Sequence, residues 1–204
     1  MRIEGKPLRK AGRQNKRDIL LNAAIEVFAK KGSSLATIAE VAKKARVALG
    51  TVYVYFESKD DLLQHCMKEI INTEIATIIQ NTTDIADPMD RLYAFFMHHV
   101  DLVKNKPYIA RFLAVEARQN ENFSKRNPGY NPLHQYIDYI KEVTSKAIEA
   151  KQIKPIDPAA LAFLLVGAMD IILWQWLSED GSVNIDTINA QLRQILHAGV
   201  AINP

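Results

Sequence analysis

The chain has 204 residues, 48% of them hydrophobic and 24% charged, so it is long enough to bury one sizeable core and has room for a smaller second one. Its single cysteine, Cys66, excludes an internal disulfide and a thiol-based zinc site, and a cytoplasmic location is expected. The formal net charge is only +3, but residues 1–59 carry 13 Lys or Arg against 5 Asp or Glu, whereas residues 60–204 carry 13 against 18.

This distribution gives the chain a basic end and an acidic body. A basic N-terminal region is typical of proteins that bind the phosphate backbone of nucleic acids, although a solvated basic tail would have the same composition. The first 18 residues lack the apolar stretch of a signal peptide, which argues against export.

The first sixty residues predict three helices. Apolar residues recur at helical spacing from Ile19 to Phe28, and Gly32 ends that helix. Thr37 can cap a short second helix that runs to about Lys44. A third helix is predicted to start near Ala48 after a three-residue turn. Two short helices joined in this way indicate a helix-turn-helix, whose second helix enters the major groove of DNA.

The residue types around the third helix suit DNA contact. Gly50 has no side chain and permits close approach of the backbone. Hydroxyl groups of Thr51, Tyr53 and Tyr55 can donate hydrogen bonds to phosphates, and Lys59 adds positive charge. The tyrosine rings are predicted to pack inward with their hydroxyl groups toward the duplex. The alternative is that both tyrosines are core aromatics.

Helices fill the rest of the chain, and no strand or repeat is predicted. Ser58 begins a long helix, in which Asp61 completes an approximate capping box. Further helices are predicted from Pro88, from Pro107 to about Gln119, from Leu133 to about Lys151, from Ala159 to Leu177 and from Ile185 to Val200, with a polar loop at residues 120–132. The fold class is therefore all-α.

The run from Ala159 to Leu177 approaches the length of a membrane span. It contains Asp170 and Gln175, and a central Asp costs ~2.5–3.5 kcal/mol on insertion scales. A helix buried on most of its circumference is the favoured interpretation, with no membrane partner. Together with the apolar stripe of the last helix, it indicates a surface that needs a partner.

The body is expected to enclose a pocket, although aromatic residues at helical spacing also occur in plain cores. His99 and Glu116 fall on otherwise apolar faces, so each needs a polar partner, either a ligand or another side chain such as Arg111, Arg118 or Asp170. The candidate ligand-binding residues are Phe95, Phe96, His99, Arg111, Phe112, Glu116, Arg118, Met169, Asp170 and Trp174.

The segment "GSSLATIAEVAKKARVALGTVYVYFESKDDLL" resembles the DNA-binding domain of the TetR family of bacterial repressors. The matching features are Gly32, Thr37, Val41-Ala42, Ala45, Val47, Gly50-Thr51, Tyr53, Tyr55-Phe56, Ser58-Lys59 and Leu62. The resemblance implies a basic arm at 1–13, a three-helix helix-turn-helix domain at 14–59, and a helical-bundle ligand-binding and dimerisation domain at 60–204.

It also implies a homodimer in which the last two helices of each chain form a four-helix interface. Two-fold symmetry then predicts a palindromic double-stranded operator with half-sites about 34–36 Å apart or a multiple of that. The expected DNA-contacting residues are Lys10, Arg13, Thr37, Arg46, Ala48, Leu49, Gly50, Thr51, Tyr53, Tyr55 and Lys59.

Two positions depart from the family pattern. Arg46 stands where the family usually has Gly, and a left-handed conformation there would cost on the order of 1 kcal/mol. Ala48 stands where the family has Ser or Thr, so a helix cap of similar value is lost. Arg46 is either an additional phosphate contact or a solvated turn residue.

The strings "VEARQNENF" and "LLVGAMDIILWQWL" resemble helices of TetR-family regulators of fatty-acid degradation. This implies a repressor that long-chain acyl-CoA releases from DNA, with Arg111 or Arg118 near the phosphorylated head. A repressor of efflux type that senses drugs or aromatic compounds is the alternative, and a DNA-binding protein that senses no ligand is a third.

An enzyme is not expected. The five histidines show no metal-ligand spacing with Asp or Glu, and Cys66 lies on a predicted helix without an evident base. Neither a glycine-rich phosphate loop nor a nucleophile elbow occurs, so no cofactor and no metal are predicted.

Overall fold

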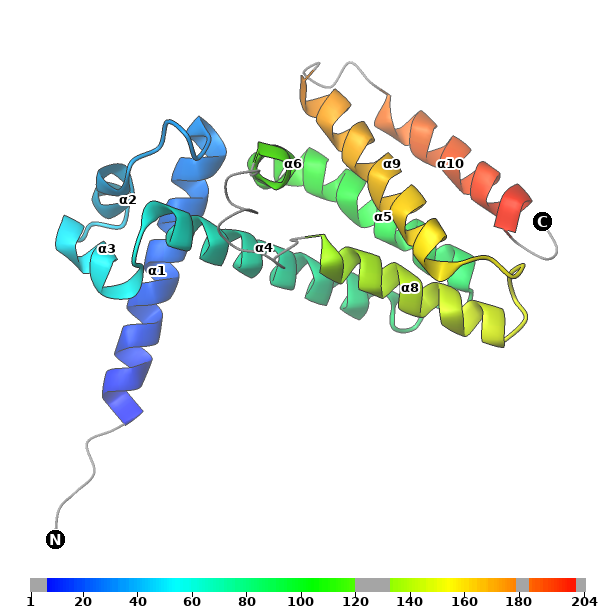
Figure 1. The fold of residues 1–204 in the computed structure, drawn as a ribbon, viewed down its shortest axis with the longest axis horizontal. Helices are drawn as coiled ribbons and strands as arrows, with labels where there is room; N and C mark the ends of the chain where they lie inside the picture. Colours follow the sequence, from blue (N-terminus) through cyan, green and yellow to red (C-terminus); the bar gives the residue numbers. More distant parts are fainter. Residues whose placement is uncertain (1–6, 120–132, 179–183, 201–204) are drawn as a thin grey trace, which may run out of the picture. The chain divides into compact units, whose positions relative to one another are not determined.

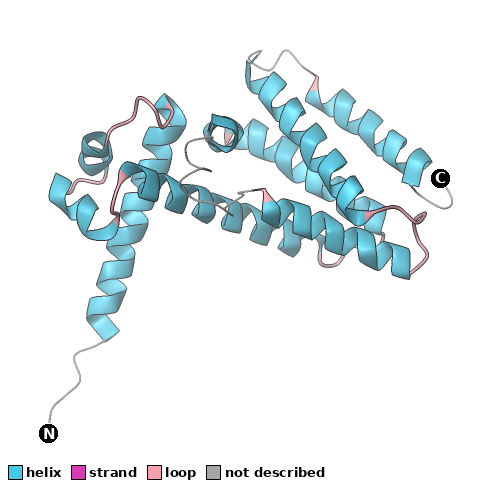
Figure 2. Cartoon of the chain, in the orientation of Figure 1, coloured by secondary structure: helices cyan, strands magenta, loops and turns pink. Residues whose placement is uncertain are grey.

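The computed structural model describes the backbone of residues 7–119, 133–178 and 184–200, and their side chains except those of residues 7–13 and 117–119. Over these residues the chain forms helices joined by short connections, with no β-strand (Figure 2). The all-α prediction is therefore confirmed. The chain divides into two units, Met1–Glu69 and Ile70–Pro204, which are taken in turn.

The first unit contains α1 (Pro7–Lys31), α2 (Ile38–Lys44), α3 (Leu49–Tyr55) and the beginning of α4 (Lys59–Thr82) (Figure 1). The helix α1 starts earlier than the apolar pattern indicates, so residues 7–13 of the predicted basic arm are helical. Proline is favoured at the first position of a helix, and the Arg, Lys and Gln residues that follow are good helix formers.

A compact apolar core holds the first unit together. The helix α1 contributes Leu20 and Phe28, and the elements after it contribute Val41, Val52 and Phe56, each at most 2% exposed. Burying one large apolar side chain contributes about 1.5–3 kcal/mol relative to leaving it in water. These residues fix α2 and α3 on α1 and so determine which face of α3 remains outside.

Cys66 belongs to this core. Its side chain is fully buried, and its thiol is within hydrogen-bonding distance of the Leu21 carbonyl oxygen at 3.8 Å. Burial raises the pKa of the Cys66 thiol far above its ordinary value, because a thiolate would lose its hydration there.

The helix ends follow the sequence signals. Gly32 adopts a left-handed φ of 75° and its N–H donates to the Phe28 carbonyl at 2.7 Å, ending α1. Thr37 and Glu40 form a reciprocal capping box at the start of α2. At the start of α4, the Ser58 hydroxyl accepts from the Asp61 N–H at 3.0 Å. The Asp61 carboxylate accepts from the N–H of residue 57 rather than from Ser58, so the predicted box is only approximate.

The second unit is a bundle around α5. It contains the remainder of α4, α5 (Pro88–Asn105), α6 (Pro107–Gln119), α8 (His134–Glu149), α9 (Pro158–Ser178) and α10 (Ile185–Val200) (Figure 1). The helix α5 packs against α6, α8, α9 and α10, which makes it central. Asp87 caps α5 by accepting from two backbone N–H groups, at 2.7 and 3.1 Å. The predicted loop at 120–132 lies outside the described residues.

The helix α9 has two unlike faces. One face, with Leu161, Leu165 and Met169, is buried in the unit. The other exposes Phe163 and Ile171 at 64% and 59%. The expectation that this helix is buried on most of its circumference is therefore wrong for the single chain, because only one side has neighbouring helices. By length and composition α9 could cross a membrane, a test that a core helix also passes.

Candidate DNA-contacting surface and effector cavity

The helices α2 and α3 form the predicted helix-turn-helix. After α2, the Val47 N–H donates to the Ala42 carbonyl at 3.0 Å, and Arg46 between them has φ = 57°. The expected left-handed conformation of Arg46 is thus present, with its steric cost. Ala48 takes the N-cap position of α3 and makes no side-chain cap, as its methyl group dictates.

The outward face of α3 consists of Leu49, Gly50, Tyr53 and Val54, all exposed. The buried Val52 lies on the opposite side, as the helical period requires. The Tyr53 side chain is 53% exposed, so the prediction that its ring packs inward is wrong.

Tyr55 and Thr51 are half-buried. Val54, 64% exposed, is not among the contacts expected from the sequence. Residues two apart on a helix point to roughly opposite sides, so the burial of Val52 is the signal that would place Val54 on the outward face.

The remaining predicted DNA-contacting residues lie outside α3 and differ in their contacts within the protein. The Thr37 hydroxyl accepts from the Glu40 N–H at 3.3 Å within the capping box. The Lys59 ammonium donates to the Ser34 carbonyl at 3.3 Å, and Arg46 is exposed at the turn. The side chains of Lys10 and Arg13 lie outside the described residues. Contact of these residues with DNA stays a prediction.

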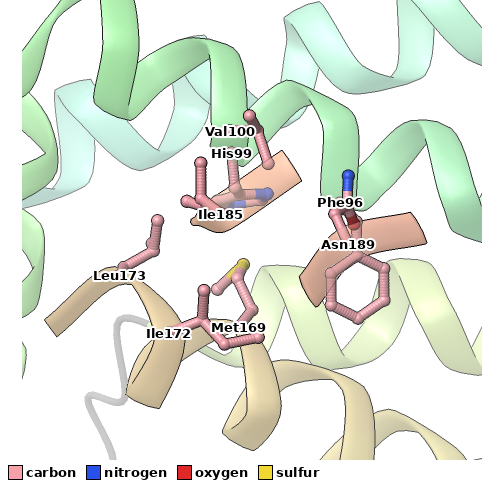
Figure 3. A pocket seen from close by; sticks show the side chains of 8 residues that line it. All are labelled: Phe96, His99, Val100, Met169, Ile172, Leu173, Ile185 and Asn189. Carbon is pink, nitrogen blue, oxygen red and sulfur yellow. The ribbon is translucent and has the colours of Figure 1, made fainter. Parts of the chain in front are cut away.

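A small cavity lies in the second unit where α5, α9 and α10 meet (Figure 3). The centre of a water molecule can occupy about 10 Å³ of it, which is about the room of one water. Its lining consists of Phe96, His99, Val100, Met169, Ile172, Leu173, Ile185 and Asn189. Six of these side chains are apolar, so the polar groups of His99 and Asn189 stand out in the wall (Figure 3).

Three predicted ligand-binding residues, Phe96, His99 and Met169, line this cavity. The others do not line it: Phe95, Phe112 and Glu116 are buried elsewhere, Asp170 is half-buried, and Arg111 and Trp174 are exposed. Trp174 is five residues beyond Met169, which places it on the other side of α9. The side chain of Arg118 lies outside the described residues.

His99 is a buried, neutral hydrogen-bond acceptor. Its side chain is 2% exposed, and burial lowers its pKa to about 4. The Nδ1–H donates to the Phe95 carbonyl at 2.7 Å, which leaves Nε2 as an acceptor without a partner among the described residues. Arg111 and Asp170, two of the partners expected from the sequence, therefore do not take this role.

More buried polar groups surround His99. The centroids of the His99 and Tyr136 rings lie 5.2 Å apart, and the Tyr136 hydroxyl also has no described partner. The adjacent His98 lies with its Nε2 2.8 Å from the Glu74 carboxylate. Burial alone would raise the pKa of Glu74, but the His98 hydrogen bond and the Lys106 charge outweigh it and hold that pKa below its ordinary value. This region can therefore hydrogen-bond a polar group inside an apolar bundle.

Two known protein families match this chain, one over most of each structural unit. Residues 20–66 match the family described as "Bacterial regulatory proteins, tetR family". Residues 67–199, more than half of the chain, match "YsiA-like protein, C-terminal region". The chain belongs to the TetR family. It is therefore a transcriptional regulator of the TetR type rather than an enzyme, as predicted from the sequence.

Individual TetR-family relatives extend over nearly the whole chain. The "Fatty acid metabolism regulator protein" of Bacillus subtilis (strain 168) is 24% identical over 182 residues, covering 89% of this chain and 93% of the relative. The structure of FadR from Bacillus subtilis in complex with stearoyl-CoA superposes with a TM-score of 0.80 at 23% identity, covering 89% and 97%. That of AibR in complex with isovaleryl coenzyme A and operator DNA gives 0.62 at 22% identity, covering 88% and 97%. These structural likenesses establish the TetR-family fold.

Proposed function

We propose that this TetR-family regulator is a cytoplasmic homodimeric repressor that binds a palindromic operator through α3 and leaves it when the body binds an acyl-CoA. The observation that supports an acyl-CoA effector is the cavity of the second unit, whose lining combines apolar side chains with polar groups. Apolar side chains from three helices meet there around His99, whose Nε2 has no partner in the described part of the chain. An acyl thioester likewise joins an apolar chain to a polar head.

Similarity supports this choice of effector class. A relative that aligns with 89% of the chain regulates fatty acid metabolism, and two related structures contain coenzyme A thioesters of different chain length. The cavity has room for only about one water, so an acyl chain requires the helices around it to move apart. Binding would thereby favour a second arrangement of the body.

The dimer is supported by the exposed apolar face of α9. Phe163, Leu164, Ile171 and Trp174 are 42–64% exposed. Gly167 lies between them in the sequence, and a Cβ added there would meet nothing within 4 Å. A second copy packed on this face would remove these side chains from water, with Gly167 allowing close approach of the helices.

Release from DNA requires a difference in affinity. An acyl-CoA can lower operator binding only if it binds the DNA-incompetent arrangement of the dimer more tightly than the competent one. By linkage, operator DNA must then weaken acyl-CoA binding by the same factor.

The test measures thermal stability and operator binding of the full-length protein against acyl-CoAs of increasing chain length, free coenzyme A, free fatty acids and aromatic hydrophobes. We expect long-chain acyl-CoA to raise the melting temperature and to release DNA, because a ligand of the folded state stabilises it. Free coenzyme A is the matched control for the head. Release by aromatic compounds alone would instead favour a repressor of efflux type, and no shift with any compound would favour a DNA-binding protein without an effector.

A further inference from the structure

The recognition helix α3 presents a face that is almost free of hydrogen-bonding side chains. Leu49, Tyr53 and Val54 are 47%, 53% and 64% exposed, and Gly50 is exposed beside them. Val52 and Phe56, on the opposite side, are at most 2% exposed and anchor the helix in the core. The exposed face is thus fixed by packing, and its chemistry is that of methyl groups, one backbone segment and one phenol.

The composition of α3 limits how it can read bases. Its sequence, LGTVYVY, contains no Arg, Lys, Asn, Gln, Asp or Glu. These are the side chains that make paired hydrogen bonds to guanine or adenine, or accept from cytosine, in the major groove. Apolar side chains instead contact the 5-methyl group of thymine, the apolar group that the major groove displays.

Gly50 adds an independent observation. A Cβ built at this position meets no atom within 4 Å, and the residue does not have a left-handed φ. Neither packing within the described chain nor backbone conformation therefore requires glycine, although glycine in a helix is up to about 1 kcal/mol less favourable than alanine. The space beside Gly50 is therefore available to an atom of bound DNA.

We propose that the face formed by Leu49, Gly50, Tyr53 and Val54 recognises thymine 5-methyl groups in each operator half-site. Leu49 and Val54 supply the methyl contacts, and Gly50 lets the bases approach. This inference rests on the proposed operator binding through α3 and adds the base chemistry that α3 selects.

The test starts from DNA that the full-length protein enriches from a random duplex pool. Enriched sequences are then synthesised with either thymidine or deoxyuridine at each half-site position, which removes only the 5-methyl group. We expect each contacted methyl to be worth about fourfold in affinity, the value for burying one such group. Replacement outside the half-sites should change nothing, and the salt dependence should stay the same because phosphate contacts are untouched.

Protein variants connect the effect to α3. Leu49→Ala and Val54→Ala should reduce the preference for thymidine over deoxyuridine, whereas Leu35→Ala, which alters a 77% exposed leucine outside α3, should retain it. Gly50→Ala should weaken binding to both DNAs without lowering the melting temperature, because its Cβ has room in the protein.

Equal affinity for thymidine and deoxyuridine operators would overturn the inference while leaving operator binding intact. Half-sites in which guanines alone determine affinity would overturn it in the same way. Failure to enrich any sequence would contradict the proposed operator binding and, with it, this inference.

Discussion

Replacing Arg46 by glycine should stabilise the DNA-binding unit. Arg46 has φ = 57°, a conformation that costs about 1–2 kcal/mol for a residue with a Cβ. Glycine removes this cost, but its greater conformational entropy in the unfolded chain lowers the free energy of unfolding by about 0.5–1 kcal/mol. The net gain is about 0.5–1 kcal/mol, which corresponds to a rise of roughly 2–8 °C in the melting temperature of a unit of this size.

Lys151 offers a matched control in the other unit. It has φ = 56°, and the Gln152 N–H after it donates to the Ala147 carbonyl at 2.9 Å, as Val47 does to Ala42 after α2. Lys151→Gly should therefore give a similar gain in unfolding free energy without changing DNA binding. Thermal and denaturant unfolding of the full-length protein measure both gains.

The same pair of variants tests whether Arg46 contacts phosphate. If it does, Arg46→Gly lowers the slope of log affinity against log salt by about 0.9, and Lys151→Gly leaves it unchanged. An unchanged slope for Arg46→Gly would make Arg46 a solvated turn residue. A loss of stability in both variants would refute the argument from backbone strain.

Three further outcomes follow from residues described above. Ala48→Ser should add a missing N-cap to α3 and raise the unfolding free energy by about 1 kcal/mol; a Ser hydroxyl that leaves stability unchanged would contradict the assignment of the cap. His99 is buried as the neutral form with a pKa of about 4 against 6.5 when unfolded, so stability present above pH 6.5 is lost as pH falls toward 4. His99→Gln should therefore lose less unfolding free energy on acidification than the parent, by about 3 kcal/mol at pH 4. Both proteins contain the nearby titratable residues Glu74 and His98, so parallel pH profiles would refute the role of His99. Ile171→Glu should shift the protein from dimer to monomer in light scattering, whereas Ala76→Glu, at an exposed position of α4 outside the apolar face of α9, serves as the control.

The helix-turn-helix is predictable from the sequence because its signals are local. Gly32 and Thr37 mark helix ends through their own backbone and hydroxyl groups, and the conformation of Arg46 follows from the place of the turn. Val54 is not predicted as a DNA contact because its side chain cannot form hydrogen bonds, although the helical period alone would place it on the outward face. The inward packing expected of Tyr53 is wrong because Val52 and Phe56 already fill the core beneath α3.

The cavity is harder to predict than the helices that form it. Its walls come from three helices, and the apolar pattern of each helix does not determine how the helices rotate against one another. The sequence correctly groups Phe96, His99 and Met169, but α9 is apolar on all sides, so its pattern cannot distinguish the buried Met169 from the exposed Trp174.

The burial of Cys66 has a consequence for chemistry rather than for folding. It is the only cysteine in the chain, its side chain is inaccessible, and the raised pKa of its thiol leaves almost no reactive thiolate at neutral pH. Oxidants and alkylating reagents should thus leave the folded regulator unmodified at this position. A cysteine introduced on the surface would then carry a spectroscopic label alone, without removal of the native residue.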